Sequence, residues 1–186
     1  MQKEELIARL DAPMKFQMVT NSTAIINSHD LDINDLLDIS FHKKKEIAFR
    51  AAWMLEYIMI HDPHKFSPYV GRLLDLLPGQ TNHSAMRHYT KMIAMLTARN
   101  ADPVYKDLSA TIDFEPVIEV LFGWLLESGI LVAAKVHCMQ SLANLAPRYQ
   151  WLKDDLRETI DHLTDTESIA FFARAKMVKK QLAQLK

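Results

Sequence analysis

The chain has 186 residues, of which 49% are hydrophobic and 24% are charged, and its 22 basic side chains almost balance its 23 acidic ones. This length suits one domain with a substantial core, and a net charge of −1 gives no general attraction to nucleic acid or to anionic lipid. The single cysteine, Cys138, excludes an internal disulfide framework and a cysteine-rich zinc site.

Only 4 glycines occur, and strand-like alternation bounded by turn residues is missing, so we expect an all-α protein without a sheet. The first residues lack the basic-then-apolar pattern of a secretory signal. No apolar stretch reaches the roughly 20 residues that a helix needs to span a bilayer. The sequence therefore predicts a cytoplasmic protein that makes no contact with a membrane.

The first strong helix signal lies at residues 46–60, after a degenerate helical unit over residues 1–42. Proline lacks an N–H group and disfavours helix in the residue before it, so Pro63 ends this helix. The adjacent pair His61 and Asp62 is interpreted as a helix end and not as a catalytic dyad. Histidine is favoured in a last helical turn, and Asp-Pro is typical of turns.

A second helix follows over residues 66–78, and Pro68 suits its first turn. The two helices and the turn between them form a unit that recurs. The second helices share one apolar pattern, carried by Val70, Leu73, Leu74 and Leu77, then Ile118, Leu121, Phe122 and Leu125, then Leu152, Leu156, Ile160 and Leu163. The first helices share a basic residue in a similar setting, namely Arg50, Arg87, Lys135 and Arg174.

A period of about 40 residues built from helix pairs resembles the HEAT and armadillo families of helical repeats. The resemblance covers about residues 44–186, and the shorter period of TPR repeats fits less well. It implies an all-α, right-handed α–α superhelix (a solenoid) of about four to five helix pairs forming one domain over residues 1–186. The expected parts are an N-terminal unit over residues 1–42, repeats over about 44–78, 84–127 and 131–164, and a C-terminal capping helix over 167–186. From the repeat pattern we expect the following residues to be buried: Ala51, Leu55, Ile58, Leu73, Leu74, Leu77, Leu121 and Leu125.

The middle repeat contains extra residues, so we expect residues 99–112 to leave the solenoid and to be mobile. Either a tolerated insertion or a functional loop explains this segment. The other histidines and the cysteine suggest no catalytic, cofactor-binding or metal site. His83 and His88 miss the spacing of a zinc-binding helix, and Cys138 lies in a helix that reads as buried.

The three tryptophans are expected to be core residues, because each sits at core-like spacing within a repeat: Trp53, Trp124 and Trp151. The last segment is basic, with Arg174, Lys176, Lys179, Lys180 and Lys186. This charge suits a solvated helix end, and a contact with phosphate or with an acidic partner is the alternative.

A partner is expected on the faces of the second helices that lie opposite the core. In the first repeat this face carries Tyr69, Arg72 and Leu76. The repeat shift carries these positions to Val117, Val120 and Trp124, and then to Asp155, Glu158 and His162. Tyr, Trp and Arg are favoured in interface cores, so the pattern indicates a surface that binds a protein or a peptide. The competing possibility places Trp124 in the core and leaves the rest as solvated surface.

The repeat resemblance thus implies a non-enzymatic binding or scaffold protein without a cofactor. The alternative is a HEAT-like DNA-binding protein or an alkylated-base DNA glycosylase, for which Trp124, Trp151 and Asp113 are the candidate residues. A net charge of −1 disfavours duplex DNA as the main ligand. A lyase of the fumarase/aspartase type is disfavoured, because the signature loop of that superfamily is absent and its fold needs a longer chain.

Overall fold

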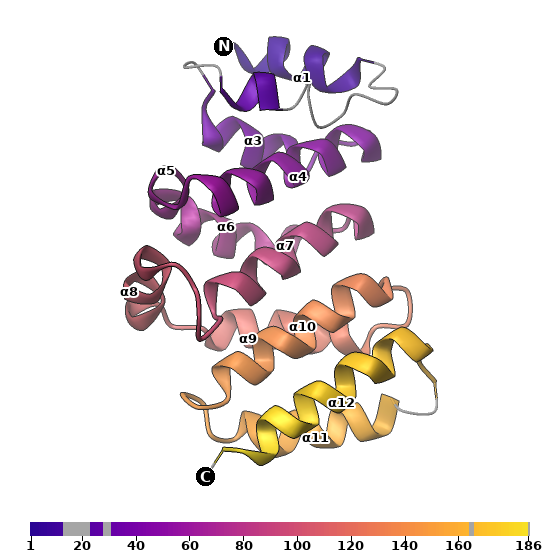
Figure 1. The fold of residues 1–186 in the computed structure, drawn as a ribbon. Helices are drawn as coiled ribbons and strands as arrows, with labels where there is room; N and C mark the ends of the chain where they lie inside the picture. Colours follow the sequence, from indigo (N-terminus) through magenta and orange to yellow (C-terminus); the bar gives the residue numbers. More distant parts are fainter. Residues whose placement is uncertain (13–22, 28–30, 164–165, 186) are drawn as a thin grey trace. The chain divides into compact units, whose positions relative to one another are not determined.

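The computed structural model describes residues 1–12, 23–27, 31–163 and 166–185 (Figure 1). Within these ranges the chain is all-helical and contains no strand, which confirms the all-α prediction, whereas the right-handed superhelix stays a prediction. Part of the predicted N-terminal unit, and Lys186 of the basic C-terminal segment, lie outside the described residues.

The contacts divide the chain into two compact units, Met1–Tyr89 and Thr90–Lys186. The first unit contains α1 (Lys3–Asp11), a helical turn at residues 23–26, α3 (Ile33–Ile39), α4 (Lys45–His61), α5 (Pro63–Phe66), a 3-10 turn η1 (Ser67–Tyr69), α6 (Val70–Leu76) and a 3-10 turn η2 (Leu77–Gly79). Helix α7 (His83–Leu96) begins in the first unit and ends in the second.

Helix α4 is the centre of the first unit. Its apolar residues extend almost around the helix, and it packs against α1, α3 and α5. The helix ends at His61, and Asp62 then caps the next helix by accepting a hydrogen bond from the Lys65 backbone N–H at 3.2 Å. The predicted helix end at His61 and Asp62 is therefore confirmed.

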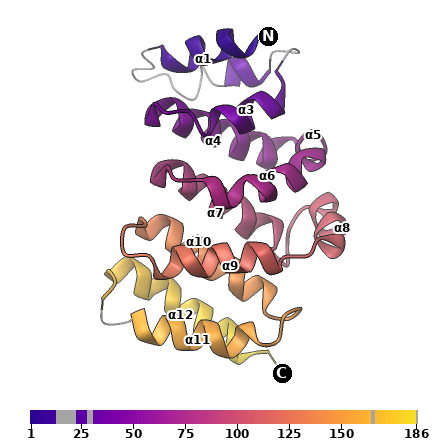
Figure 2. The same cartoon turned by 180° about the vertical axis from the view of Figure 1, so that it is seen from behind.

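The second unit contains α8 (Pro103–Thr111), α9 (Glu115–Leu126), α10 (Val132–Leu145), α11 (Leu152–Leu163) and α12 (Ile169–Ala183). Helices α10 and α12 lie side by side in one layer, and α9 and α11 lie side by side in the other (Figures 1 and 2). Helix α10 is the centre of this unit, because it packs against α9, α11 and α12.

Residues 99–112, which the sequence analysis expected to leave the solenoid, contain a helix. Asp102 accepts a hydrogen bond from the Val104 backbone N–H at 3.0 Å, and Pro103 follows as the first helical residue, so the segment folds into α8. Tyr105 of this helix is buried. The expected mobility of the segment stays a prediction.

The recurring basic residues of the first helices join neighbouring helices within each unit. Arg50 of α4 donates to the backbone oxygens of Leu10 and Ala12, where α1 ends and its carbonyl groups lack helical partners. Lys135 of α10 is buried and pairs with Glu167, just before α12, at 2.5 Å. Arg174 of α12 donates to the Gln140 side chain of α10 at 3.1 Å. The repeated position therefore has a structural role at these three residues.

The core contains every residue that the sequence analysis expected to be buried, namely Ala51, Leu55, Ile58, Leu73, Leu74, Leu77, Leu121 and Leu125. The three tryptophans were all expected in the core, but they differ in exposure. Trp124 is 7% exposed and belongs to the core, Trp53 is half-buried, and Trp151 is 48% exposed. The prediction that Trp151 is a core residue is wrong, because its neighbour Leu152 takes the inward position at the start of α11.

Candidate binding surface

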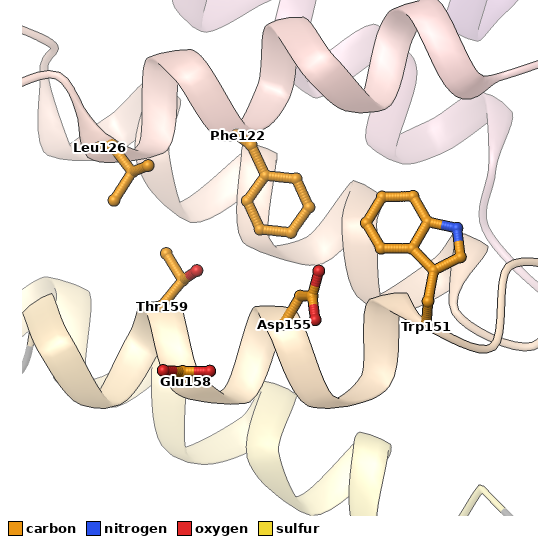
Figure 3. Close-up of a pocket in the computed structure, with 6 residues that line it drawn as sticks. All are labelled: Phe122, Leu126, Trp151, Asp155, Glu158 and Thr159. Atoms are coloured by element: carbon orange, nitrogen blue, oxygen red, sulfur yellow. The ribbon is translucent and has the colours of Figure 1, made fainter.

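An open hollow of about 390 Å³ lies between α9 and α11 in the second unit (Figure 3). It is lined by Phe122, Leu126, Trp151, Asp155, Glu158 and Thr159. The hollow therefore combines aromatic and aliphatic side chains with two carboxylates.

The helical period explains why these side chains meet. In α9 the inward positions are filled by Val117, Ile118, Leu121, Trp124 and Leu125. Phe122 and Leu126 are four residues apart, so they share the other face of α9. In α11 the inward residues are Leu152, Leu156, Ile160 and Leu163. Trp151, Asp155 and Glu158 follow one another at spacings of four and three residues and line the outer face.

The apolar part of the hollow is exposed to solvent. The rings of Phe122 and Trp151 are stacked, with their centroids 6.3 Å apart and an angle of 21° between their planes. Leu126 is 51% exposed and extends from α9 toward α11 beside Phe122 (Figure 3). Contiguous apolar surface with a polar rim is typical of interaction sites.

The described residues supply no cation to the charged part of the hollow. Among the described residues, neither Asp155 nor Glu158 has a side-chain hydrogen bond or an ion pair. Two carboxylates of α11 that do not line the hollow do have partners, since Asp154 lies 3.8 Å from Arg157 and Asp161 pairs with Lys179 of α12. The negative charge at the hollow is therefore left for a ligand or for solvent.

The predicted partner-binding stripe meets the hollow only in part. Asp155 and Glu158 line it, and His162 is exposed further along α11. On α9 the hollow is lined by Phe122 and Leu126 and not by Val120 and Trp124.

The α9 residues of the predicted stripe were obtained by shifting the positions of α6 by a fixed number of residues, and this shift explains why they do not line the hollow. Short 3-10 turns flank α6, and a 3-10 turn has 3.0 residues where an α-helical turn has 3.6. Helix α9 is continuous from Glu115, so a fixed residue shift does not carry one face of α6 onto the same face of α9. Trp124 and Val117 consequently lie in the core, and Val120 is half-buried. A core position for Trp124 was the competing possibility in the sequence analysis.

The first predicted triplet belongs to the first unit, where Tyr69, Arg72 and Leu76 are all half-buried. Arg72 donates to the side chains of Asn34 and Asp38 at 2.5 Å each, and Asp38 also pairs with Lys3 at 2.5 Å. These contacts fasten α6 to α3, so Arg72 has a structural partner of its own. The continuous stripe of three triplets stays a prediction.

The residues proposed for the glycosylase alternative do not form one site in this hollow. Trp151 lines it, but Trp124 is buried. Asp113 caps α9 by accepting from the Glu115 backbone N–H at 3.1 Å, and it also accepts from the Tyr149 hydroxyl at 3.1 Å. Its carboxylate is thus engaged at a helix start.

His61, His88 and Cys138 do not line the α9–α11 hollow. The exposed His61 ring lies 4.1 Å from the Tyr57 ring, and both residues line a separate hollow of about 510 Å³ that includes Asp62. His88 is buried and its Nδ1 lies 2.6 Å from a carboxylate oxygen of Glu56. Sequence reasoning missed this pair, although a glutamate inside an apolar helix was the signal for it. Burial raises the pKa of the Cys138 thiol, which keeps this group protonated.

In the part of the chain that the structure describes, no group of histidine, cysteine, aspartate and glutamate side chains is arranged to hold a metal ion. No helix there combines the length and the apolar character that crossing a bilayer requires. Comparisons with protein-family models, with curated proteins and with solved structures found no match for this chain.

Proposed function

We propose that the protein is a non-enzymatic binding protein of the HEAT/armadillo-like solenoid type, and that the hollow between α9 and α11 binds a protein or peptide partner. Three features of the chain support the repeat assignment. These are the recurring helix pairs, the basic residue shared by the first helices, and the two-layer arrangement of α9 to α12. In such repeats the second helices form a surface suited to extended partners.

The observation that carries the proposal is the exposure of Trp151 and Leu126 next to the Phe122 ring. A half-exposed tryptophan offers a large rigid contact area that loses little entropy on binding, and such residues dominate interface energies. A partner side chain that covers both residues removes their apolar surface from water. Binding would therefore be driven mainly by this burial.

The size and openness of the hollow suit one or two side chains of a peptide. Enzyme and cofactor sites enclose most of a small ligand, whereas Trp151 and Leu126 remain half exposed here. The two carboxylates also disfavour the phosphate backbone of a nucleic acid, because like charges repel. A protein or peptide partner is accordingly preferred over the DNA-binding alternative.

Selection from a phage-displayed random peptide library on the purified chain tests the proposal. Selected peptides should bind the native chain and lose at least about tenfold in affinity for the Trp151→Ala/Leu126→Ala double variant, because aromatic and aliphatic anchors dominate interface energies. Leu131→Ala is the matched control, since Leu131 is 47% exposed in the same unit but lies outside the hollow. If no selected peptide distinguishes the double variant from the native chain, the proposal is wrong.

A further inference from the structure

We infer that the hollow between α9 and α11 selects a basic partner segment, in which an arginine or lysine side chain stands next to an apolar one. This inference rests on the proposed function and names the chemistry of its partner.

The first argument is the contrast among the carboxylates of α11. Asp154 and Asp161 face cations of the chain itself, namely Arg157 and Lys179. Asp155 and Glu158 face the hollow and have no such partner among the described residues. None of the described residues that line the hollow is basic, so a cation from outside meets two carboxylates there.

The second argument is the position of the aromatic rings. Asp155 extends from α11 toward Phe122 and beside Trp151 (Figure 3). A cation held by Asp155 therefore comes close to aromatic surface, where the ring quadrupole attracts positive charge. A guanidinium group can stack on an aromatic face while it donates hydrogen bonds to a carboxylate, so arginine fits this arrangement best.

The third argument is the apolar end of the hollow. Leu126 is 51% exposed and lies near Thr159 at the end opposite Trp151 (Figure 3). A residue that follows the cation by one or two positions in an extended peptide can cover this leucine. The hollow thus favours a basic residue paired with a neighbouring apolar residue over a uniformly charged segment.

The composition of the selected peptides tests the inference. Peptides selected on the native chain should be enriched in arginine or lysine next to an apolar residue. Their affinity should fall by about fivefold to thirtyfold for the Asp155→Asn/Glu158→Gln variant, as expected when two charge contacts at an exposed site are lost. A rise in salt concentration should weaken binding to the native chain more than binding to this variant.

The matched control removes the same charge from the same helix. Asp154→Asn/Asp161→Asn neutralises two carboxylates of α11 that do not line the hollow, and it should change the affinity by less than about twofold. Charge reversal in Asp155→Lys/Glu158→Lys should instead enrich acidic peptides. Circular dichroism of each variant should show the native helical content.

The outcomes separate the inference from the proposed function. If peptides depend on Trp151 and Leu126 but carry no basic residue and tolerate Asp155→Asn/Glu158→Gln, the inference is wrong and the proposed function stands. If no peptide depends on Trp151 and Leu126, both are wrong. Analytical ultracentrifugation tests whether two copies of the chain associate through the hollow. We expect no self-association of the native chain that is lost in the Asp155→Asn/Glu158→Gln variant. Such an association would contradict the inference, because a second copy would then occupy the hollow.

Discussion

Two surfaces of the molecule differ in how their charged side chains are paired. One lies between α3 and α6 in the first unit, and the other lies between α9 and α11 in the second unit. In the first, Arg72 bonds to Asn34 and Asp38, and Lys3 also pairs with Asp38. In the second, Asp155 and Glu158 have no cationic partner among the described residues, and Trp151 stands half exposed between the helices. A surface between two helices can therefore be closed by ion pairs of the chain or left without them.

The difference teaches that the charge pairing of a surface says more about its availability to a partner than its composition does. Both surfaces contain aspartates and large side chains. Only the pairing of Asp38 with Arg72 and Lys3 shows that the first surface is already satisfied. A partner for the α3–α6 surface would have to displace these contacts, whereas a partner for the hollow gains contacts that nothing in the described structure supplies.

The largest expected effect tests whether both surfaces rest on equally packed cores. Leu55 of α4 and Leu142 of α10 are fully buried, one in each unit. Leu55→Ala and Leu142→Ala should each lower the free energy of unfolding by about 2–5 kcal/mol, because each leaves a cavity and loses apolar burial. Urea denaturation followed by circular dichroism measures the change. A loss below about 1 kcal/mol at Leu142 alone would show that the second unit is loosely packed, and the open hollow would then reflect poor packing.

The next effect tests whether the hollow is confined to the surface. Cys138 is fully buried in α10, which packs against both α9 and α11. Burial raises the pKa of its thiol, so the reactive thiolate is scarce at pH 8 in the folded protein and common after unfolding. Labelling by a disulfide reagent should therefore be at least about a hundredfold slower in buffer than in concentrated urea. Fast labelling of the folded chain would show that the space between α9 and α11 opens into the core.

The smallest effect separates the two surfaces directly. Asp38→Asn should lower the free energy of unfolding by about 0.5–1 kcal/mol, since its ion pairs are partly exposed and screened by solvent. Glu158→Gln should change it by less than about 0.5 kcal/mol in either direction, because no cation of the described structure is lost. Equal losses for the two variants would remove the contrast between a closed surface and an open one.

The sequence was sufficient to predict the all-α character, the helix that ends before Pro63, and the eight apolar residues that the repeat pattern placed in the core. These features follow from local periodicity and from the chemistry of proline. It also placed Asp155 and Glu158 on the outer face of α11, because that helix has one uninterrupted apolar stripe.

The composition of the α9 side of the hollow could not be predicted in the same way. Helix α9 is apolar on nearly every face, so the sequence does not show whether Phe122 or Trp124 turns inward. Trp151 lies directly before α11, where periodicity gives no direction for a side chain. The ion pairs of Arg72 depend on residues more than thirty positions away, which a repeat pattern does not relate to it.

The most direct measurement of the central claim follows the indole N–H resonances of the three tryptophans by NMR while a selected basic peptide is added. Trp151 lines the hollow, Trp124 is buried in α9 and Trp53 is half-buried in the first unit. Substitution of each tryptophan by phenylalanine assigns its resonance. We expect the largest shift at Trp151 and none at Trp53, with saturation at the peptide concentration at which binding saturates. A bound peptide that leaves the Trp151 resonance unchanged would contradict the claim that the α9–α11 hollow is the binding site.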